Sequence, residues 1–138
     1  MAELLNISSH DEGGIGGIVN GRGYDVLLLN YLPRLHWDRI DDMQRHLETD
    51  ECFVLLEGRA VLFLAAGEEQ PGELEHCELE KGKIYTVPRN VWHTQTMTEN
   101  AKILLVECSG TVAENSPRCP VSPEQKEQIA RWGRHIFD

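Results

Sequence analysis

Short apolar runs alternate with turn residues along most of this chain. Runs of this length, rich in Val, Leu and Ile and bounded by Gly, Pro and Asn, are typical of the strands of an all-β sandwich or barrel. The pattern predicts strands over residues 24–32, 51–56, 60–66, 73–79, 84–87, 91–98 and 101–108. We therefore expect an all-β fold, with one exception at the C-terminus.

Three segments break the strand pattern. Residues 11–23 contain six glycines and are predicted to be a loop or a short irregular strand. Residues 34–43 and 109–121 are predicted to be loops. A tight corner is expected at residues 88–90, because Asn90 can adopt the left-handed backbone conformation that such a bend needs.

The C-terminus changes to a helical pattern over about residues 122–135. Ser122 can cap a helix, Pro123 suits its first turn, and Gln125 completes a capping box. The apolar residues at helical spacing are Ile129, Trp132 and Ile136. One face of this short α-helix should therefore dock on the barrel or on a partner.

Length and charge narrow the possible partners. A chain of 138 residues fits one domain, over residues 1–138. Its net charge of −10 argues against nucleic acid or an anionic membrane surface, which an acidic protein repels. Residues 1–10 lack the basic and apolar pattern of a signal peptide, and no apolar run is long enough to span a bilayer. We expect a cytoplasmic protein.

The four cysteines, Cys52, Cys77, Cys108 and Cys119, form no C-x-x-C pair. A zinc knuckle or a thioredoxin-type motif is therefore not indicated. Cys52 and Cys108 lie inside apolar runs, so we expect them to be buried and reduced, as small hydrophobic residues.

A candidate metal site arises where polar residues interrupt the apolar strands. Gln44 and His46 are two residues apart, so they share a face if this segment is extended. Glu51 begins an otherwise apolar strand, and a carboxylate there is costly to bury unless a positive charge meets it. His93 begins another strand some forty residues later.

These residues resemble the first motif of the cupin superfamily. His46 matches the second histidine of that motif, Glu51 matches its glutamate after four intervening residues, and Gly58 matches its closing glycine after six more. Two positions depart from the motif, since Gln44 replaces its first histidine and Asp38 its opening glycine.

The second cupin motif is matched in register by Gly82, Pro88 and His93. Here Asn90 replaces a glycine and Met97 replaces the final asparagine. Asn90 is a mild departure, because asparagine tolerates the same turn. The resemblance covers about residues 38–97, and the strand pattern extends it to about 108.

The resemblance implies a double-stranded β-helix, or jelly-roll barrel, over about residues 24–108. It implies that His46, Glu51 and His93 hold a divalent metal, with Gln44 as a weak fourth ligand. Two histidines and one carboxylate suit Fe(II) and would also accept Mn, Ni or Zn. The resemblance favours a homodimer, and strand 51–56 is apolar on both faces, so the C-terminal helix or a second subunit should cover its outer side.

Function is less defined than fold, because one fold hosts many functions. The leading hypothesis is a metal-dependent enzyme of the dioxygenase, isomerase or decarboxylase type, acting on a small polar metabolite. The second is a metal-free protein that binds a small ligand without catalysis. A third is a metal-free epimerase-like enzyme using Tyr85 with His93. Candidate cavity-lining residues are His36, Phe53, Tyr85, Gln95 and Met97.

Overall fold

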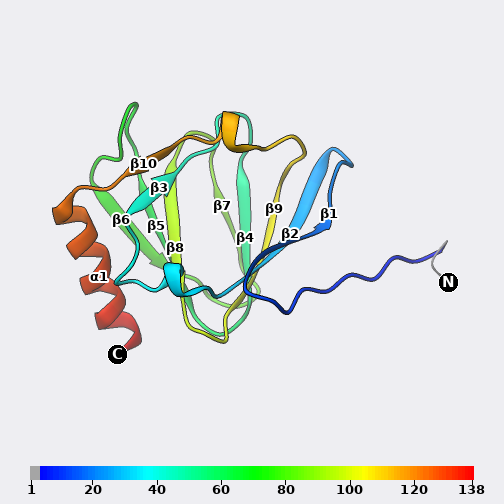
Figure 1. Cartoon of the computed structure of the whole chain (residues 1–138), viewed down its shortest axis with the longest axis horizontal. Helices are drawn as coiled ribbons and strands as arrows, with labels where there is room; N and C mark the ends of the chain where they lie inside the picture. Colours follow the sequence, from blue (N-terminus) through cyan, green and yellow to red (C-terminus); the bar gives the residue numbers. More distant parts are fainter. Residues whose placement is uncertain (1–3) are drawn as a thin grey trace.

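Two antiparallel five-stranded sheets face each other in the computed structural model, which describes residues 4–138 (Figure 1). The strand order is β1-β2-β9-β4-β7 in the first sheet and β10-β3-β8-β5-β6 in the second. The strands are β1 (Gly14–Val19), β2 (Tyr24–Asn30), β3 (Asp42–Gln44), β4 (Glu51–Glu57), β5 (Ala60–Ala65), β6 (Leu74–Glu78), β7 (Ile84–Val87), β8 (Trp92–Met97), β9 (Lys102–Cys108) and β10 (Arg118–Pro120). This arrangement confirms the all-β, jelly-roll-like prediction.

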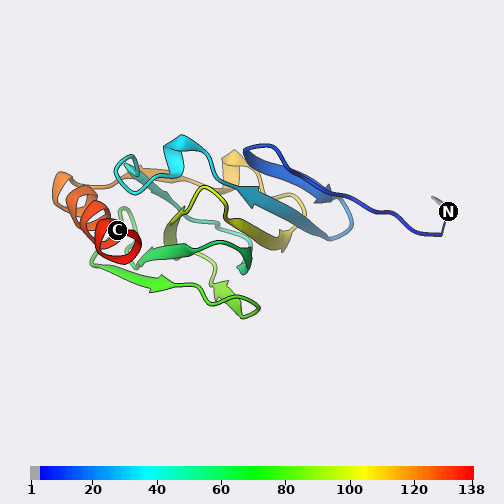
Figure 2. The same cartoon turned by 90° about the horizontal axis from the view of Figure 1, so that it is seen from below.

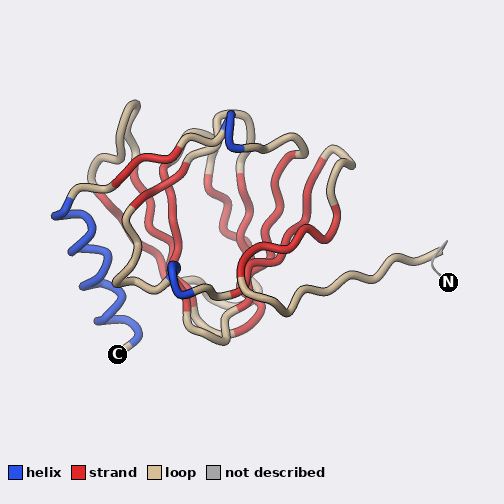
Figure 3. The backbone as a smooth tube through the Cα atoms, viewed as in Figure 1, coloured by secondary structure: helices blue, strands red, loops and turns tan. Residues whose placement is uncertain are grey.

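All seven strands predicted from the apolar pattern are present, and Figure 3 shows them as the body of the molecule with loops at their ends. Three further strands lie in segments predicted as loop or irregular structure, namely β1, β3 and β10. Two of them have only three residues, which is too short to carry a periodic signal. Two short 3-10 helices, Pro33–Leu35 and Ala113–Asn115, lie in the connections.

The main core fills the space between the two sheets. Along β4 the side chains alternate, so that Glu51, Phe53 and Leu55 point inward. The turn after β4 needs glycine, because Gly58 has a φ of +71° and a Cβ there would lie 2.6 Å from the Cα of Ala101. The buried members of this core include Leu29, Phe53, Leu55, Leu62, Met97, Ile103 and Leu105.

The C-terminal helix α1 (Pro123–Phe137) covers the outer face of the second sheet (Figure 2). Its start is confirmed as predicted, since the Ser122 side chain accepts a hydrogen bond from the Gln125 backbone N–H in a capping box. Ile129 is fully buried in a second core cluster that also holds Trp92 of β8 and Phe63 of β5. The apolar face of α1, expected from helical spacing to dock on the barrel or on a partner, therefore packs on the barrel.

The outer face of the first sheet is not covered in this way, and the prediction that Cys52 and Cys108 are buried was wrong. Of the two covers expected for the outer side of β4, the C-terminal helix or a second subunit, the helix is not the one, because α1 packs on the other sheet. For the same reason Cys52 is only half-buried and Cys108 is exposed, because both point outward from this sheet. All four cysteines are free.

Residues 4–9 run away from the barrel, on the side opposite to α1 (Figure 1, Figure 2). Among residues 4–138, no helix combines the length and the apolar character required to cross a membrane.

Replacing Ile129 with Ala should lower the free energy of unfolding by about 2–5 kcal/mol, because a fully buried side chain leaves a cavity under α1. Urea titration would measure this. The matched control is Lys126→Ala on the exposed side of the same helix, which should change stability little. Equal effects of the two substitutions would show that α1 does not depend on this contact.

Candidate metal centre

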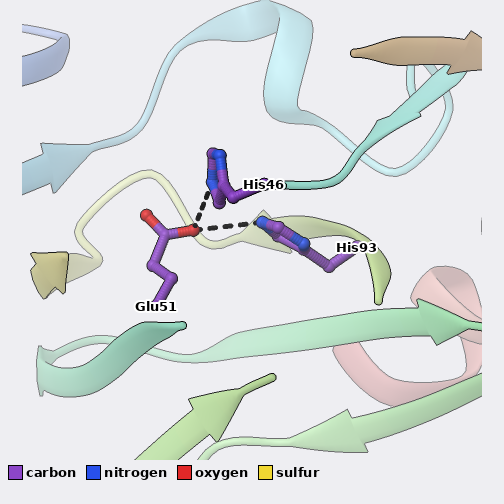
Figure 4. Close-up of side chains that lie close together, drawn as sticks. All are labelled: His46, Glu51 and His93. Carbon is purple, nitrogen blue, oxygen red and sulfur yellow. Dashed lines mark hydrogen bonds and ion pairs between the residues drawn. The ribbon is translucent and has the colours of Figure 1, made fainter. Parts of the chain in front are cut away.

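Two histidines and a glutamate from three separate segments converge inside the barrel (Figure 4). His46 follows β3, Glu51 is the first residue of β4, and His93 lies in β8. The Nε2 atoms of His46 and His93 lie 3.2 and 3.0 Å from the same carboxylate oxygen, Oε1 of Glu51. One nitrogen or oxygen atom from each residue lies within 4.8 Å of the other two.

All three side chains are buried, with exposed fractions of 7%, 6% and 5% for His46, Glu51 and His93. The outer nitrogen of each ring is held by a second hydrogen bond. His93 Nδ1 donates to the carbonyl of Val91, at 3.0 Å. His46 Nδ1 lies 2.7 Å from Ser116 Oγ. Because that hydroxyl donates to Oδ1 of Asn115, we assign Nδ1 of His46 as the donor to it.

These outer hydrogen bonds determine what the inner nitrogens can do. Because each Nδ1 carries a proton, each neutral ring presents a lone pair at Nε2. Two lone pairs and a carboxylate oxygen then face one another in a buried space, which is unfavourable without positive charge among them. Either the rings take up protons or a cation binds. Two imidazole nitrogens and a carboxylate, oriented by outer hydrogen bonds, are a donor set that fits a divalent transition metal.

A backbone corner holds the two histidine segments together. Asn90 adopts the left-handed conformation, with a φ of 73°, as predicted for this turn. Its N–H donates to the carbonyl of His46 at 2.9 Å. The neighbouring N–H of Arg89 donates to the carboxylate of Asp50 at 2.8 Å. Two hydrogen bonds therefore join the corner before β8 to the loop that carries His46 and leads to Glu51.

Electrostatics favour a charged pairing within this group. Burial alone would raise the pKa of Glu51, but hydrogen bonds from His46 and His93 lower it to about 2. Burial alone would lower the pKa of His46, yet its hydrogen bond with Glu51 and the negative charges of Glu51 and Glu107 raise it. Glu51 is therefore an anion across the neutral range, and it draws positive charge to the site.

Glu107 is a neighbour of this site that the sequence analysis missed. It lies in β9 directly opposite Glu51, and its Oε2 atom is 3.8 Å from His46 Nε2. Burial and the charge of Glu51 raise the pKa of Glu107 to about 7. The available signal was alternation, because Ile103, Leu105 and Glu107 share one face of this strand.

A cavity of about 500 Å³ opens beside the centre. Glu51 and His93 lie in its wall, together with Gln44, Phe53 and Gln95. Gln44 pairs with His93 across β3 and β8, and its amide N–H donates to the carbonyl of Ser116 at 3.3 Å. The structure therefore brings Gln44 next to the three residues and places Phe53 and Gln95 on the cavity wall.

Three residues considered as cavity lining lie elsewhere. Met97 and His36 border a different cavity of about 490 Å³. This cavity lies next to the 3-10 helix Pro33–Leu35 and the C-terminal end of α1. Tyr85 packs against the main core, and its hydroxyl accepts a hydrogen bond from the backbone N–H of Glu80 at 3.0 Å. Within residues 4–138 no hydrogen bond joins Tyr85 to His93, so nothing in the geometry supports that pair as an acid–base couple.

The backbone resembles solved structures of enzymes with small β-barrels. A variant of Streptomyces PAC13, a nucleoside dehydratase, solved with uridine, matches at a TM-score of 0.56 and 13% identity, over 84% of this chain and 86% of that one. Hydroquinone 1,2-dioxygenase PnpCD, solved with Cd²⁺ and 4-hydroxybenzonitrile, matches at 0.51 and 15%, over 68% and 63%. Both are cupin-fold enzymes.

This chain has the cupin fold. A cupin-2 domain protein from Shewanella frigidimarina is also similar, at a TM-score of 0.47 and 22% identity over 75% of this chain and 84% of that one. The sequence itself matches no protein-family model and no curated protein. The likeness therefore concerns the cupin fold and not an activity.

Glu107→Gln should make the chelator-treated protein more stable above pH 7, raising the melting temperature by a few degrees. The folded-state pKa of Glu107, about 7, exceeds its ordinary value of 4.5. The folded protein therefore binds more protons than the unfolded chain between these values, and the native protein loses stability as pH rises through this window. The advantage of the variant should shrink as pH falls from 7 to 4.5.

Thermal unfolding followed by circular dichroism at several pH values would test this. Glu57→Gln, on the exposed end of β4, serves as the control, because it removes a charge of the same sign from a solvated position. A stability difference between Glu107→Gln and the native protein that stays constant with pH would contradict the assignment.

Proposed function

We propose that this protein is a metal-dependent cupin in which His46, Glu51 and His93 hold a divalent transition metal, namely Fe, Mn, Ni or Zn. The observation that carries the proposal is the buried convergence of two Nε2 atoms on one carboxylate oxygen, at 3.0 and 3.2 Å. Glu51 and His93 border a cavity of the size that holds a small metabolite. Gln44 lies opposite His93 across β3 and β8, and we propose its amide as a weak additional ligand.

The cavity wall indicates what kind of molecule would bind. Three arginines, Arg34, Arg39 and Arg118, line it together with the amides of Gln44 and Gln95. Arg118 is paired with Asp42 at 3.4 Å, whereas no ion pair is recorded for Arg34 or Arg39 within residues 4–138. The same wall also carries the carboxylates of Asp41, Asp42 and Glu51, so its charges are mixed and favour a small polar ligand.

In this proposal the metal supplies Lewis acidity and open coordination positions for the substrate or, if it is iron, for O₂. The protein's own groups do the rest. Ser116 and the Val91 carbonyl keep both Nε2 lone pairs directed inward, the arginines attract the ligand, and Phe53 closes one side of the cavity. PAC13 solved with uridine and PnpCD solved with Cd²⁺ support the idea that this fold accommodates small molecules and metal ions.

The alternative is a metal-free cupin that binds a small ligand without catalysis. The observation in its favour is Gln44, which replaces a motif histidine and whose amide group is already hydrogen-bonded to Ser116. In that case the two imidazoles would meet Glu51 as protonated rings. The single-domain extent of the chain and its cytoplasmic location stay predictions from the sequence.

Untagged native protein should contain a transition metal at near-stoichiometric amounts, and His93→Ala should lower its metal affinity by about tenfold or more. The reason is the loss of one of two imidazole donors. Elemental analysis and metal titration would measure both quantities. His135→Ala, on the exposed side of α1, is the matched control and should keep the metal. Full occupancy in His93→Ala, or a native protein that takes up no metal on titration, would favour the metal-free alternative.

We also propose that two copies of the chain associate through the outer side of the first sheet. Six apolar residues lie there in two adjacent rows across the strands, and none belongs to either core cluster. This bare face comprises Val26, Leu28, Val54, Ile84, Leu104 and Val106. The other two residues of these rows, Cys52 and Thr86, are uncharged as well.

A second copy is the occupant that fits best, because an uncharged apolar sheet face is complementary to itself under twofold symmetry. Among residues 4–138, the one α-helix covers the equivalent face of the second sheet and so does not lie on this one. The result would be a homodimer with one bare face from each subunit at its centre.

Ile84→Glu should convert the protein to a monomer, because it places one buried charge from each subunit within the proposed interface. The side chain is 71% exposed in the isolated chain, so the substitution should leave the fold intact. Light scattering after size-exclusion chromatography would report the mass. Val112→Glu, at a 50% exposed loop position away from the sheet, is the control and should stay dimeric. A native protein that is monomeric at high concentration would contradict the proposal.

A further inference from the structure

A fourth donor lies beside the three residues of the proposed metal centre. Glu107 and Glu51 are direct neighbours across β9 and β4, and both point into the barrel. The side chain of Glu107 is only 10% exposed. Its Oε2 atom lies 3.8 Å from Nε2 of His46, which is the nitrogen that also faces Glu51.

The Oε2 atom of Glu107 is buried without a hydrogen-bond partner among residues 4–138. The next inward carboxylate in the same row, that of Asp25, differs in this respect. It accepts hydrogen bonds from the backbone N–H of Gly21 and from the hydroxyl of Ser109. The fold thus supplies donors to Asp25 and leaves one oxygen of Glu107 without any. A buried carboxylate oxygen that lacks a donor is costly, so something else must satisfy it.

We infer that Glu107 is a fourth protein ligand of the metal, which completes a set of two imidazoles and two carboxylates. This inference rests on the proposed metal site. Two atoms bound to one ion at about 2.0–2.2 Å lie at most about 4.4 Å apart. The 3.8 Å between Glu107 Oε2 and His46 Nε2 satisfies this limit. Glu107 is not among the three groups whose donor atoms lie within 4.8 Å of one another, so its carboxylate must turn toward Glu51 and His93 when the ion binds.

The chemistry of such a set differs from that of a site with one carboxylate. Two carboxylates neutralise a divalent ion, so the buried centre has no net charge, which lowers the cost of placing it in the barrel. Added carboxylate oxygen also shifts the donor set toward harder ions, of which Mn(II) is the transition-metal example. Glu107 would thereby take the place in the coordination sphere that the motif histidine, here Gln44, leaves open.

The experiment measures Mn²⁺ and Zn²⁺ affinity of the metal-stripped, untagged full-length chain by competition with a chelator. Glu107→Gln keeps the shape of the side chain and removes its charge, and it should weaken Mn²⁺ binding by about tenfold or more. Glu107→Asp keeps the charge and draws the carboxylate back, so it should also weaken binding. Glu57→Gln removes a charge from the exposed end of β4 and should bind as the native protein does.

X-ray absorption of the Mn²⁺-loaded proteins provides a second readout, in which the Glu107 variants should lose a protein oxygen neighbour of the metal. Native-like affinity in Glu107→Gln would overturn the inference while leaving the three-residue site intact. So would native-like affinity in Glu107→Asp alone, since it would show that Glu107 acts through its charge and not by contact. Failure of the native protein to bind either ion would instead overturn the metal site itself, and the inference with it.

Discussion

The charge of Glu51 is the constraint around which this barrel is organised. A carboxylate placed at the head of an inward-facing apolar row needs compensating positive charge, and this chain provides two imidazoles directed at the same oxygen atom. Each imidazole is kept in that orientation by a partner on its other side, the hydroxyl of Ser116 or the carbonyl of Val91. The arrangement is therefore poised to accept a cation.

Backbone hydrogen bonds hold the segments that carry His46, His93 and Glu107 in place. The left-handed residue Asn90 turns the chain from β7 into β8, and its N–H reaches back to the carbonyl of His46. His93 follows this corner by three residues, so its position is fixed relative to His46 by one hydrogen bond and a short length of strand. The register between β4 and β9 sets the fourth position, that of Glu107, in the same way.

Most of the fold could be predicted from the sequence, because seven strands and α1 carry clear periodic signals. The resemblance of the spacing of His46, Glu51 and His93 to the cupin motifs also predicted that these residues would come together. Alternation along β9 indicates that Glu107 shares the face of Ile103 and Leu105, but it could not connect Glu107 with the site, because the partner strand that brings it next to Glu51 is not known from the sequence. The exposure of Cys108 was missed for a related reason: strand periodicity shows which residues share a face, but not which face a helix will cover.

The inward and outward faces of strand β9 belong to two different proposed sites. Glu107 points inward beside His46, while its neighbour Val106 points outward in the bare face. Because Val106 and Glu107 are consecutive residues of one strand, a displacement of the backbone there moves both side chains. In the proposed homodimer, the partner subunit would restrict the movement of β9 and so hold Glu107 in place. Contacts made by one subunit would then affect the position of a metal ligand in the other.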